Sequence, residues 1–156
     1  MSYETVKWIH IISAILLFGT GFGSAFYKYM ADRSGNLATI AITNRHVVLA
    51  DWIFTSPTVV IQPLSGFWLA HLQGYSLTTS WLLTSIVLFV LAGACWLPVV
   101  YLQIRNRNDA TKALSTQSEL QPRYWRDARL WFWLGIPAFS AMLVIVYLMI
   151  AKPTIQ

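Results

Sequence analysis

Three side chains in this sequence are candidates to hold a redox metal, namely His10, His71 and Met149. Imidazole nitrogens and thioether sulfurs are common axial ligands of haem iron, and they also bind copper. His10 lies in a hydrophobic stretch, where an ionisable side chain is costly unless it faces the protein interior beside a partner. We therefore expect His10 to be a haem ligand, a copper ligand, a proton carrier for a quinone or another substrate, or else a structural histidine that is hydrogen-bonded to a neighbouring helix.

Polar side chains accompany His10 on two hydrophobic segments. Ser13 lies one turn after His10, on the same face of a helix. In the second segment five polar side chains recur at helical spacing: Asp51, Thr55, Thr58, Gln62 and Ser65. Because such a stripe cannot face lipid tails, it should line the bundle interior or a wet cavity. We expect Ser13 and Gln62 to adjust the metal pocket through hydrogen bonds.

The elements that position these side chains are predicted to be transmembrane helices. Of 156 residues, 56% are hydrophobic and 11% are charged, against about 25% charged residues in an ordinary soluble domain. A helix that crosses a bilayer needs about 20 apolar residues, and four such segments occur at residues 6–30, 47–72, 81–104 and 130–151. The sequence therefore predicts an all-α, four-helix membrane bundle in a single domain, 1–156.

Basic residues, Lys28 among them, are concentrated around the first and third connections, while residues 73–80 carry no charge. Because positively charged loops stay in the cytoplasm, both termini are predicted to lie outside. The net charge of +5 then follows from topology, and no nucleic acid partner is expected. Asp51 falls near the cytoplasmic level, where we expect an ion pair with Arg129 or Arg105, or else a proton-relay role.

The same topology brings the start of the first span and the end of the second to one level near the outer surface. His10 and His71 share that level, and Met149 lies near the outer end of the fourth span. On an ideal helix, however, His71 is nine residues from Gln62 and points about half a turn away from the polar stripe. Pro63 could correct this by kinking the helix. Without that kink, His71 is an interfacial histidine.

Several other classes of site have no support in the sequence. The single Cys95 excludes an internal disulfide and any zinc or iron–sulfur site that needs several cysteines. There is no HExxH-type zinc motif, no phosphate-binding loop and no nucleophile–base pair. Hydrolases and nucleotide-dependent enzymes are therefore not expected.

The first span contains the sequence Lys7-Trp8-Ile9-His10-Ile11-Ile12, followed by Phe18-Gly19 and Phe26-Tyr27. This pattern resembles the opening helix of HemJ-type protoporphyrinogen oxidases and, more loosely, the CopD copper-resistance membrane proteins. HemJ-type enzymes bind haem b through a histidine in a comparable context, so the resemblance implies that His10 is the haem ligand. Their later motifs are not matched in the third and fourth spans. The sequence therefore favours electron transfer between a quinone and an acceptor as much as it favours porphyrinogen oxidation.

Further stretches occur in the other three spans: Ala50-Asp51-Trp52-Ile53-Phe54-Thr55, Gln62-Pro63-Leu64-Ser65-Gly66, Gly93-Ala94-Cys95-Trp96-Leu97-Pro98 and Arg129-Leu130-Trp131-Phe132. Over nearly its whole length the chain is similar to an uncharacterised family of bacterial four-helix membrane proteins, a domain of unknown function. That resemblance implies the inner membrane of a bacterium. It supplies no activity.

The sequence thus favours a haem b redox protein in which His10 binds iron and His71 or Met149 takes the other axial position. A quinone or a porphyrinogen is the expected substrate. Two alternatives stay open. One is a protein that transports or handles copper or a small solute, and the other is a cofactor-free accessory subunit of a membrane complex. A homo-oligomer is compatible with each.

Overall fold

The computed structural model describes residues 2–153, which form helices joined by short connections. The elements are α1 (Tyr3–Ser34), α2 (Leu37–Ala50), the π-helix η1 (Asp51–Thr55), α3 (Ser56–Leu72), α4 (Ser80–Ser115) and α5 (Pro122–Ala151). Since α2, η1 and α3 follow one another without a break, the described chain has four helical stretches that are long and apolar enough to cross a membrane. The predicted all-α, four-span fold is confirmed.

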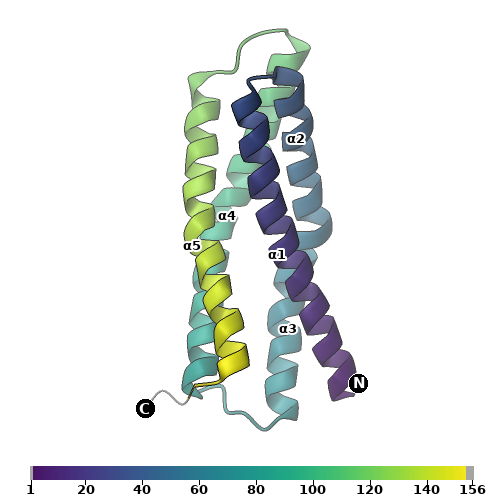
Figure 1. Cartoon of the computed structure of the whole chain (residues 1–156), viewed down its shortest axis with the longest axis vertical. Helices are drawn as coiled ribbons and strands as arrows, with labels where there is room; N and C mark the ends of the chain where they lie inside the picture. Colours follow the sequence, from purple (N-terminus) through teal and green to yellow (C-terminus); the bar gives the residue numbers. More distant parts are fainter. Residues whose placement is uncertain (1, 154–156) are drawn as a thin grey trace.

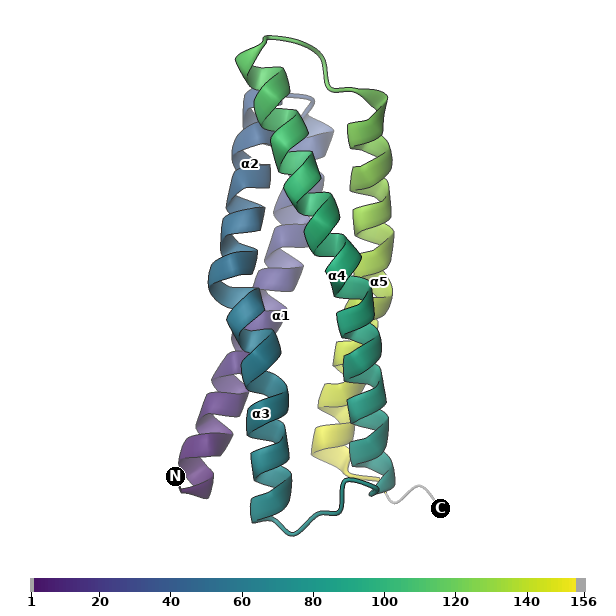
Figure 2. The same cartoon turned by 180° about the vertical axis from the view of Figure 1, so that it is seen from behind.

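The four stretches run antiparallel along one long axis (Figure 1). Both termini and the α3–α4 connection lie at one end, which we call the terminal end. The α1–α2 and α4–α5 connections lie at the other, which we call the basic end. In Figure 2, α4 and α5 pack along each other, while α1 packs against α2 and α3. The two halves meet mainly where α2 contacts α4, and contact between α1 and α5 is sparse.

Two residues in the turn between α1 and α2 explain why the chain reverses direction there. Gly35 has a φ of +64°, a left-handed conformation that costs little without a Cβ atom. The side chain of Asn36 then accepts a hydrogen bond from the backbone nitrogen of Thr39 at 3.0 Å and caps α2. Because the turn is this short, α2 begins beside the end of α1, and the two helices pack together.

Buried side chains form separate clusters along the bundle instead of one core. One cluster includes Tyr124 at the basic end, a second includes Trp131, and a third includes Trp81 at the terminal end. Among the described residues, far more large hydrophobic side chains are exposed than buried. That surface suits a bundle surrounded by lipid tails, which are as apolar as the side chains themselves.

Candidate functional site

The junction between α2 and α3 sets the geometry of the site. Residues Asp51–Thr55 form a π-helix, and the backbone nitrogen of Ser56 donates to the carbonyl oxygen of Asp51, five residues earlier. Pro57, at the start of α3, has no backbone N–H and cannot donate to the carbonyl four residues before it. The hydroxyl of Thr58 donates to two carbonyl oxygens of the preceding turn, both at 2.8 Å. Single π-turns of this kind are frequent at functional sites.

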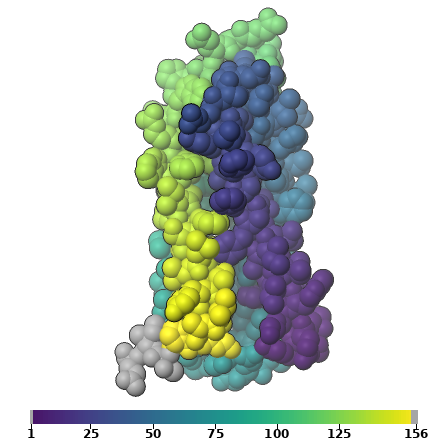
Figure 3. Space-filling view, viewed as in Figure 1, coloured from purple at the N-terminus to yellow at the C-terminus, as the bar shows by residue number. Residues whose placement is uncertain are grey.

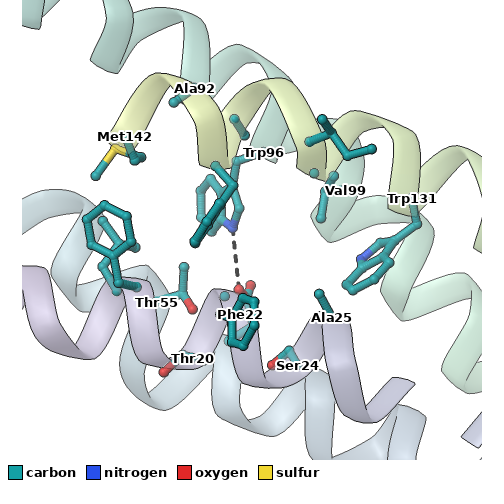
Figure 4. A pocket seen from close by; sticks show the side chains of 18 of the residues that line it. Thr20, Phe22, Ser24, Ala25, Thr55, Ala92, Trp96, Val99, Trp131 and Met142 are labelled. Carbon is teal, nitrogen blue, oxygen red and sulfur yellow. Dashed lines mark hydrogen bonds between the residues drawn. The ribbon is translucent and has the colours of Figure 1, made fainter. Parts of the chain in front are cut away.

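A cavity of about 530 Å³ opens between the helices at the level of this π-helix. Figure 4 shows side chains that line it from several helices, and its full lining comes from α1, from α2 with η1 and α3, from α4 and from α5. Most lining residues are apolar or aromatic. The polar ones without a ring are Thr20, Ser24, Asp51, Thr55, Gln103 and Ser140. Cavities of about 300–1,000 Å³ with a few polar groups in an apolar wall are typical binding sites for small molecules.

Asp51 is the one acidic side chain among the described residues that line the cavity, and it is 9% exposed. The indole nitrogen of Trp96 donates to its Oδ1 at 3.4 Å, and this bond is the dashed line at Trp96 in Figure 4. In the described part of the chain, no salt bridge involves Asp51. An acidic residue inside a transmembrane span without a basic partner is a functional candidate by default.

Two donors approach this carboxyl group without forming an ordinary hydrogen bond to it. Thr55 and Gln103 are its neighbours. The hydroxyl of Thr55 and the amide nitrogen of Gln103 are buried without a hydrogen-bond partner of ordinary geometry among the described residues. The amide oxygen of Gln103 accepts from the indole of Trp131 at 3.3 Å. Because a buried polar group without a partner costs about 1–3 kcal/mol, the two donors indicate a place for the oxygen atoms of a ligand.

His10 does not line the cavity and lies in the contact between α1 and α3. Its Nδ1 is 2.8 Å from the hydroxyl oxygen of Ser65, and the amide of Gln62 donates to its backbone carbonyl at 2.9 Å. A Cβ atom on Gly66 would lie 3.4 Å from Cε1 of His10, so the glycine permits this close approach. Ser13, one turn further along α1, is buried and its hydroxyl has no partner among the described residues.

The other two predicted metal ligands are not part of this contact. His71 is exposed near the C-terminal end of α3, so it stays on the outside of the bundle despite Pro63. Met149 is partly buried and packs beside the cluster that contains Trp81. Within residues 2–153, no group of three or more His, Cys, Asp or Glu side chains is arranged to hold a metal ion.

The structure does not bring Arg129 to Asp51. Arg129 is exposed. Arg105, the alternative partner, instead forms an ion pair with Asp127 at 2.5 Å, and Asp127 is 1% exposed. Asp127 lies closer to the basic end, and it binds Arg105, which the sequence predicted as a partner of Asp51.

A second buried polar cluster lies toward the basic end. The ammonium group of Lys28, which is 2% exposed, donates to Asp32 at 3.1 Å and to the hydroxyl of Tyr124 at 3.0 Å. The hydroxyl of Tyr124 donates in turn to Asp32 at 2.5 Å and accepts from the amide of Asn44 at 2.8 Å. This cluster joins α1, α2 and α5. We call it the Lys28 cluster.

Sequence reasoning did not select Trp96 and Gln103 as site residues, although each carries a signal. Gln103 is a polar side chain inside the third hydrophobic span, where an amide needs a partner. Trp96 lies in the middle of that span, away from the headgroup level at which tryptophans act as anchors. Both residues point to an interior polar site.

Comparison with known protein families gives one match. The family described as "Predicted integral membrane protein (DUF2269)" matches residues 4–153, and the chain belongs to this family. No curated protein and no solved structure matches the chain. The predicted membership in an uncharacterised membrane family is therefore confirmed, and the resemblance of α1 to HemJ-type and CopD proteins stays a prediction.

Proposed function

We propose that this integral membrane protein binds a quinone-type lipid in its central cavity and takes part in quinone-linked redox chemistry. One observation carries the proposal: an apolar cavity meets a small buried polar group made by Asp51, Thr55 and Gln103. A quinone likewise combines a small polar part, the ring with its carbonyl oxygens, with a large apolar part, its tail. The proposed location is the inner membrane of a bacterium, with the basic end in the cytoplasm.

The side chains of Asp51, Thr55 and Gln103 can bind both the oxidised and the reduced form of a quinone ring. The hydroxyl of Thr55 and the amide nitrogen of Gln103 are unpaired donors, which match the carbonyl oxygens of a quinone. The carboxyl group of Asp51 can accept a hydrogen bond, and then a proton, from a hydroxyl of the reduced quinol. Reduction of a quinone to a quinol takes up one proton for each electron. A titratable group beside the ring oxygen therefore has a defined role.

We place the entrance to the cavity between α1 and α5, on the side of the lipid tails. These helices meet through Phe139, whose ring centre lies 5.5 Å from that of Phe18 and 6.1 Å from that of Phe22. Figure 3 shows the side chains of α1 and α5 closing over the middle of this face. Aromatic rings can part without breaking any hydrogen bond, so this contact suits the passage of an isoprenoid tail.

A porphyrinogen, the other substrate expected from the sequence, fits this cavity less well. Its propionate groups are anionic, and none of the described residues lining the cavity is Lys, Arg or His. The carboxyl group of Asp51 would repel them. A quinone is therefore the preferred ligand.

A haem b at His10 is the second part of the proposal, because the surroundings of His10 fit one axial ligand. The hydroxyl of Ser65 at Nδ1 would fix the imidazole ring and leave Nε2 for the iron. The bond from Gln62 holds this turn of α1 in place. When bound, the haem would supply one-electron transfer. His71 is exposed on α3 and Met149 packs beside the cluster that contains Trp81, so the second ligand from either residue stays a prediction.

Ligand binding can be tested on the detergent-purified full-length chain with a short-tailed ubiquinone. Quenching of tryptophan fluorescence reports binding, because Trp96 and Trp131 line the cavity. We expect saturable quenching, and we expect Gln103→Leu to weaken binding about tenfold, which corresponds to one lost hydrogen bond in a buried site. A quinone that never saturates the signal would contradict the proposal.

Asn106→Leu is the matched control for this experiment. Asn106 lies one turn from Gln103 on α4 and is fully buried, but it does not line the cavity. The ubiquinone affinity of this variant should equal that of the unchanged protein. Equal loss of affinity in Asn106→Leu and Gln103→Leu would assign the effect to packing of α4 and not to the ligand.

Visible absorbance tests the haem independently of the quinone. Protein expressed with an adequate haem supply should show a Soret band, together with sharp α and β bands after reduction. His10→Ala should lose these bands and retain its helical circular dichroism, whereas His71→Ala should keep them. A colourless protein that haem does not reconstitute would refute haem binding. Its copper content would then be the next measurement, because copper is the alternative metal.

A further inference from the structure

A second hollow, unused by the proposed function, lies at the basic end between α2 and α4. It measures about 510 Å³ and is lined by Arg45, Arg107, Asn108, Thr111, Lys112 and Ser115. Arg45 comes from α2. The other five residues lie on successive turns of one side of α4. The described lining therefore contains three cations and no carboxylate.

These three cations have no salt-bridge partner in the part of the chain that the structure describes. Three carboxylates at this end form ion pairs with other basic residues: Asp32 with Lys28, Asp109 with Arg123, and Asp127 with Arg105 and Arg126. Glu119 lies in the α4–α5 connection and does not line the hollow. The guanidinium group of Arg107 donates to the side-chain oxygen of Asn108, which is neutral. Because like charges without a counter-charge repel one another, an anion in the hollow would stabilise this end of the bundle.

The groups that line the hollow favour a phosphate. A guanidinium group presents several donors in one plane, and it binds phosphate oxygens through paired hydrogen bonds. Arg45 and Arg107 supply two such groups from different helices, and Lys112 adds a mobile ammonium group. Thr111 contributes a hydroxyl group. Together they can surround an anion that has several oxygen atoms.

The surfaces beside the hollow indicate where that phosphate comes from. One turn beyond Arg45 on α2, Leu49 is 54% exposed, and one turn before Arg107 and Asn108 on α4 lies the partly buried apolar side chain of Ile104. Both lie toward the membrane interior, since α2 runs away from the basic end and α4 runs toward it. A lipid with its phosphate in the hollow would lay its acyl chains along these two side chains.

We propose that Arg45, Arg107 and Lys112 form a binding site for the phosphate head group of an anionic phospholipid. Basic pockets between transmembrane helices on the cytoplasmic side are a known setting for such head groups. The bound lipid would offset part of the positive charge of the hollow and join α2 to α4. This site is separate from the central cavity, so it stands whether or not a quinone binds there.

Native mass spectrometry of the full-length protein in a neutral detergent tests the site. The protein is titrated with phosphatidylglycerol or with phosphatidylcholine, and inorganic phosphate is added as a competitor. We expect phosphatidylglycerol to bind more tightly than phosphatidylcholine. The double variant Arg45→Gln with Arg107→Gln should lower the phosphatidylglycerol affinity roughly thirtyfold, at about fivefold for each cation removed.

Two further double variants keep the test specific. Arg33→Gln with Arg129→Gln removes the same charge from exposed positions outside the hollow and should leave the affinity unchanged. Arg45→Lys with Arg107→Lys keeps the charge but loses the paired donors, and it should retain an intermediate affinity. Circular dichroism checks that each variant is folded.

Three results would overturn the proposal. Equal weakening by the two glutamine double variants would mean that the overall charge of the basic end attracts the lipid. Equal binding of phosphatidylglycerol and phosphatidylcholine would mean that no anion is selected. Inorganic phosphate that binds as tightly as phosphatidylglycerol and displaces it would show a site for free phosphate and not for a lipid.

Discussion

The Lys28 cluster and the group around Asp51 are both buried sets of charged and polar side chains, but they differ in how completely they are paired. Lys28, Asp32 and Tyr124 bond to one another. Asp51 has one long bond from Trp96, and the donors of its neighbours have no partner of ordinary geometry among the described residues. The charged groups of the first set are paired within the chain, and the Oδ1 atom of Asn44 is the one polar atom of that set without a partner among the described residues. The second can be completed by a ligand.

The surroundings of the two sets explain the difference. Tyr124 belongs to a packed cluster with Ile40 and Ala110, and Lys28, which bonds to Tyr124, is almost fully buried. Asp51 lies at the π-helix, where the backbone is irregular and a cavity opens beside it. Burial of polar groups is therefore common to a structural cluster and a binding site. Unpaired donors that face a cavity separate the two.

The largest expected effect comes from breaking the ion pair in the Lys28 cluster. Lys28→Met should lower the free energy of unfolding by about 3 kcal/mol, because it leaves the Asp32 carboxylate without its cation in a largely buried position. Unfolding in detergent, followed by circular dichroism, measures this. Arg33→Met removes an exposed cation five residues later and should change the free energy by less than about 0.5 kcal/mol. If Lys28→Met proved as stable as the unchanged protein, Lys28 would not be structural.

Asp51→Leu should raise the free energy of unfolding, whereas Lys28→Met should lower it. The Asp51 substitution removes a buried acidic group that has no basic partner, so we expect the free energy of unfolding to rise by about 1 kcal/mol. Binding of the reduced form, ubiquinol, should fall at the same time, because the acceptor for its hydroxyl group is gone. The same unfolding assay and fluorescence titration measure both changes. A loss of stability as large as that of Lys28→Met would place Asp51 among the structural residues.

Asn106 sharpens the comparison, because it is buried and unpaired but does not line the cavity. Its exposed fraction is 0%, and both polar atoms of its side chain lack partners among the described residues. We expect Asn106→Leu to stabilise the protein by about 0.5–1 kcal/mol, since it removes an unsatisfied buried amide. An unchanged ubiquinone affinity, measured by fluorescence, would show that an unpaired group marks a binding site only beside a cavity. Lost affinity would contradict that rule.

The sequence predicts a large part of this architecture. Hydrophobic length gives the four spans, and helical spacing gives the buried stripe, of which Asp51, Thr58 and Ser65 are all less than 10% exposed. It does not predict which partner each polar residue meets. Lys28 bonds to Tyr124, 96 residues away, and such a pairing depends on how the helices pack.

The stripe itself divides in a way that ideal spacing cannot show. Asp51 and Thr55 line the cavity, whereas Gln62 and Ser65 contact His10 on α1. The π-helix is the physical reason, because it holds one extra residue in a turn and so shifts the following positions by about 100° around the helix axis. Pro57 is the visible sign of that irregularity, but a proline alone does not specify the size of the shift.

The π-helix η1 acts as a one-residue insertion, which changes the direction in which the side chains after it point around the helix axis. Asp51, the first residue of η1, faces Trp96 of α4, and Gln62, downstream of η1, faces His10 of α1. Deletion of a single residue such as Ile53 would restore one uniform phase and point both halves of the stripe in the same direction. The chain can therefore supply polar groups to two different neighbours from one transmembrane segment, with no loop inside the bilayer.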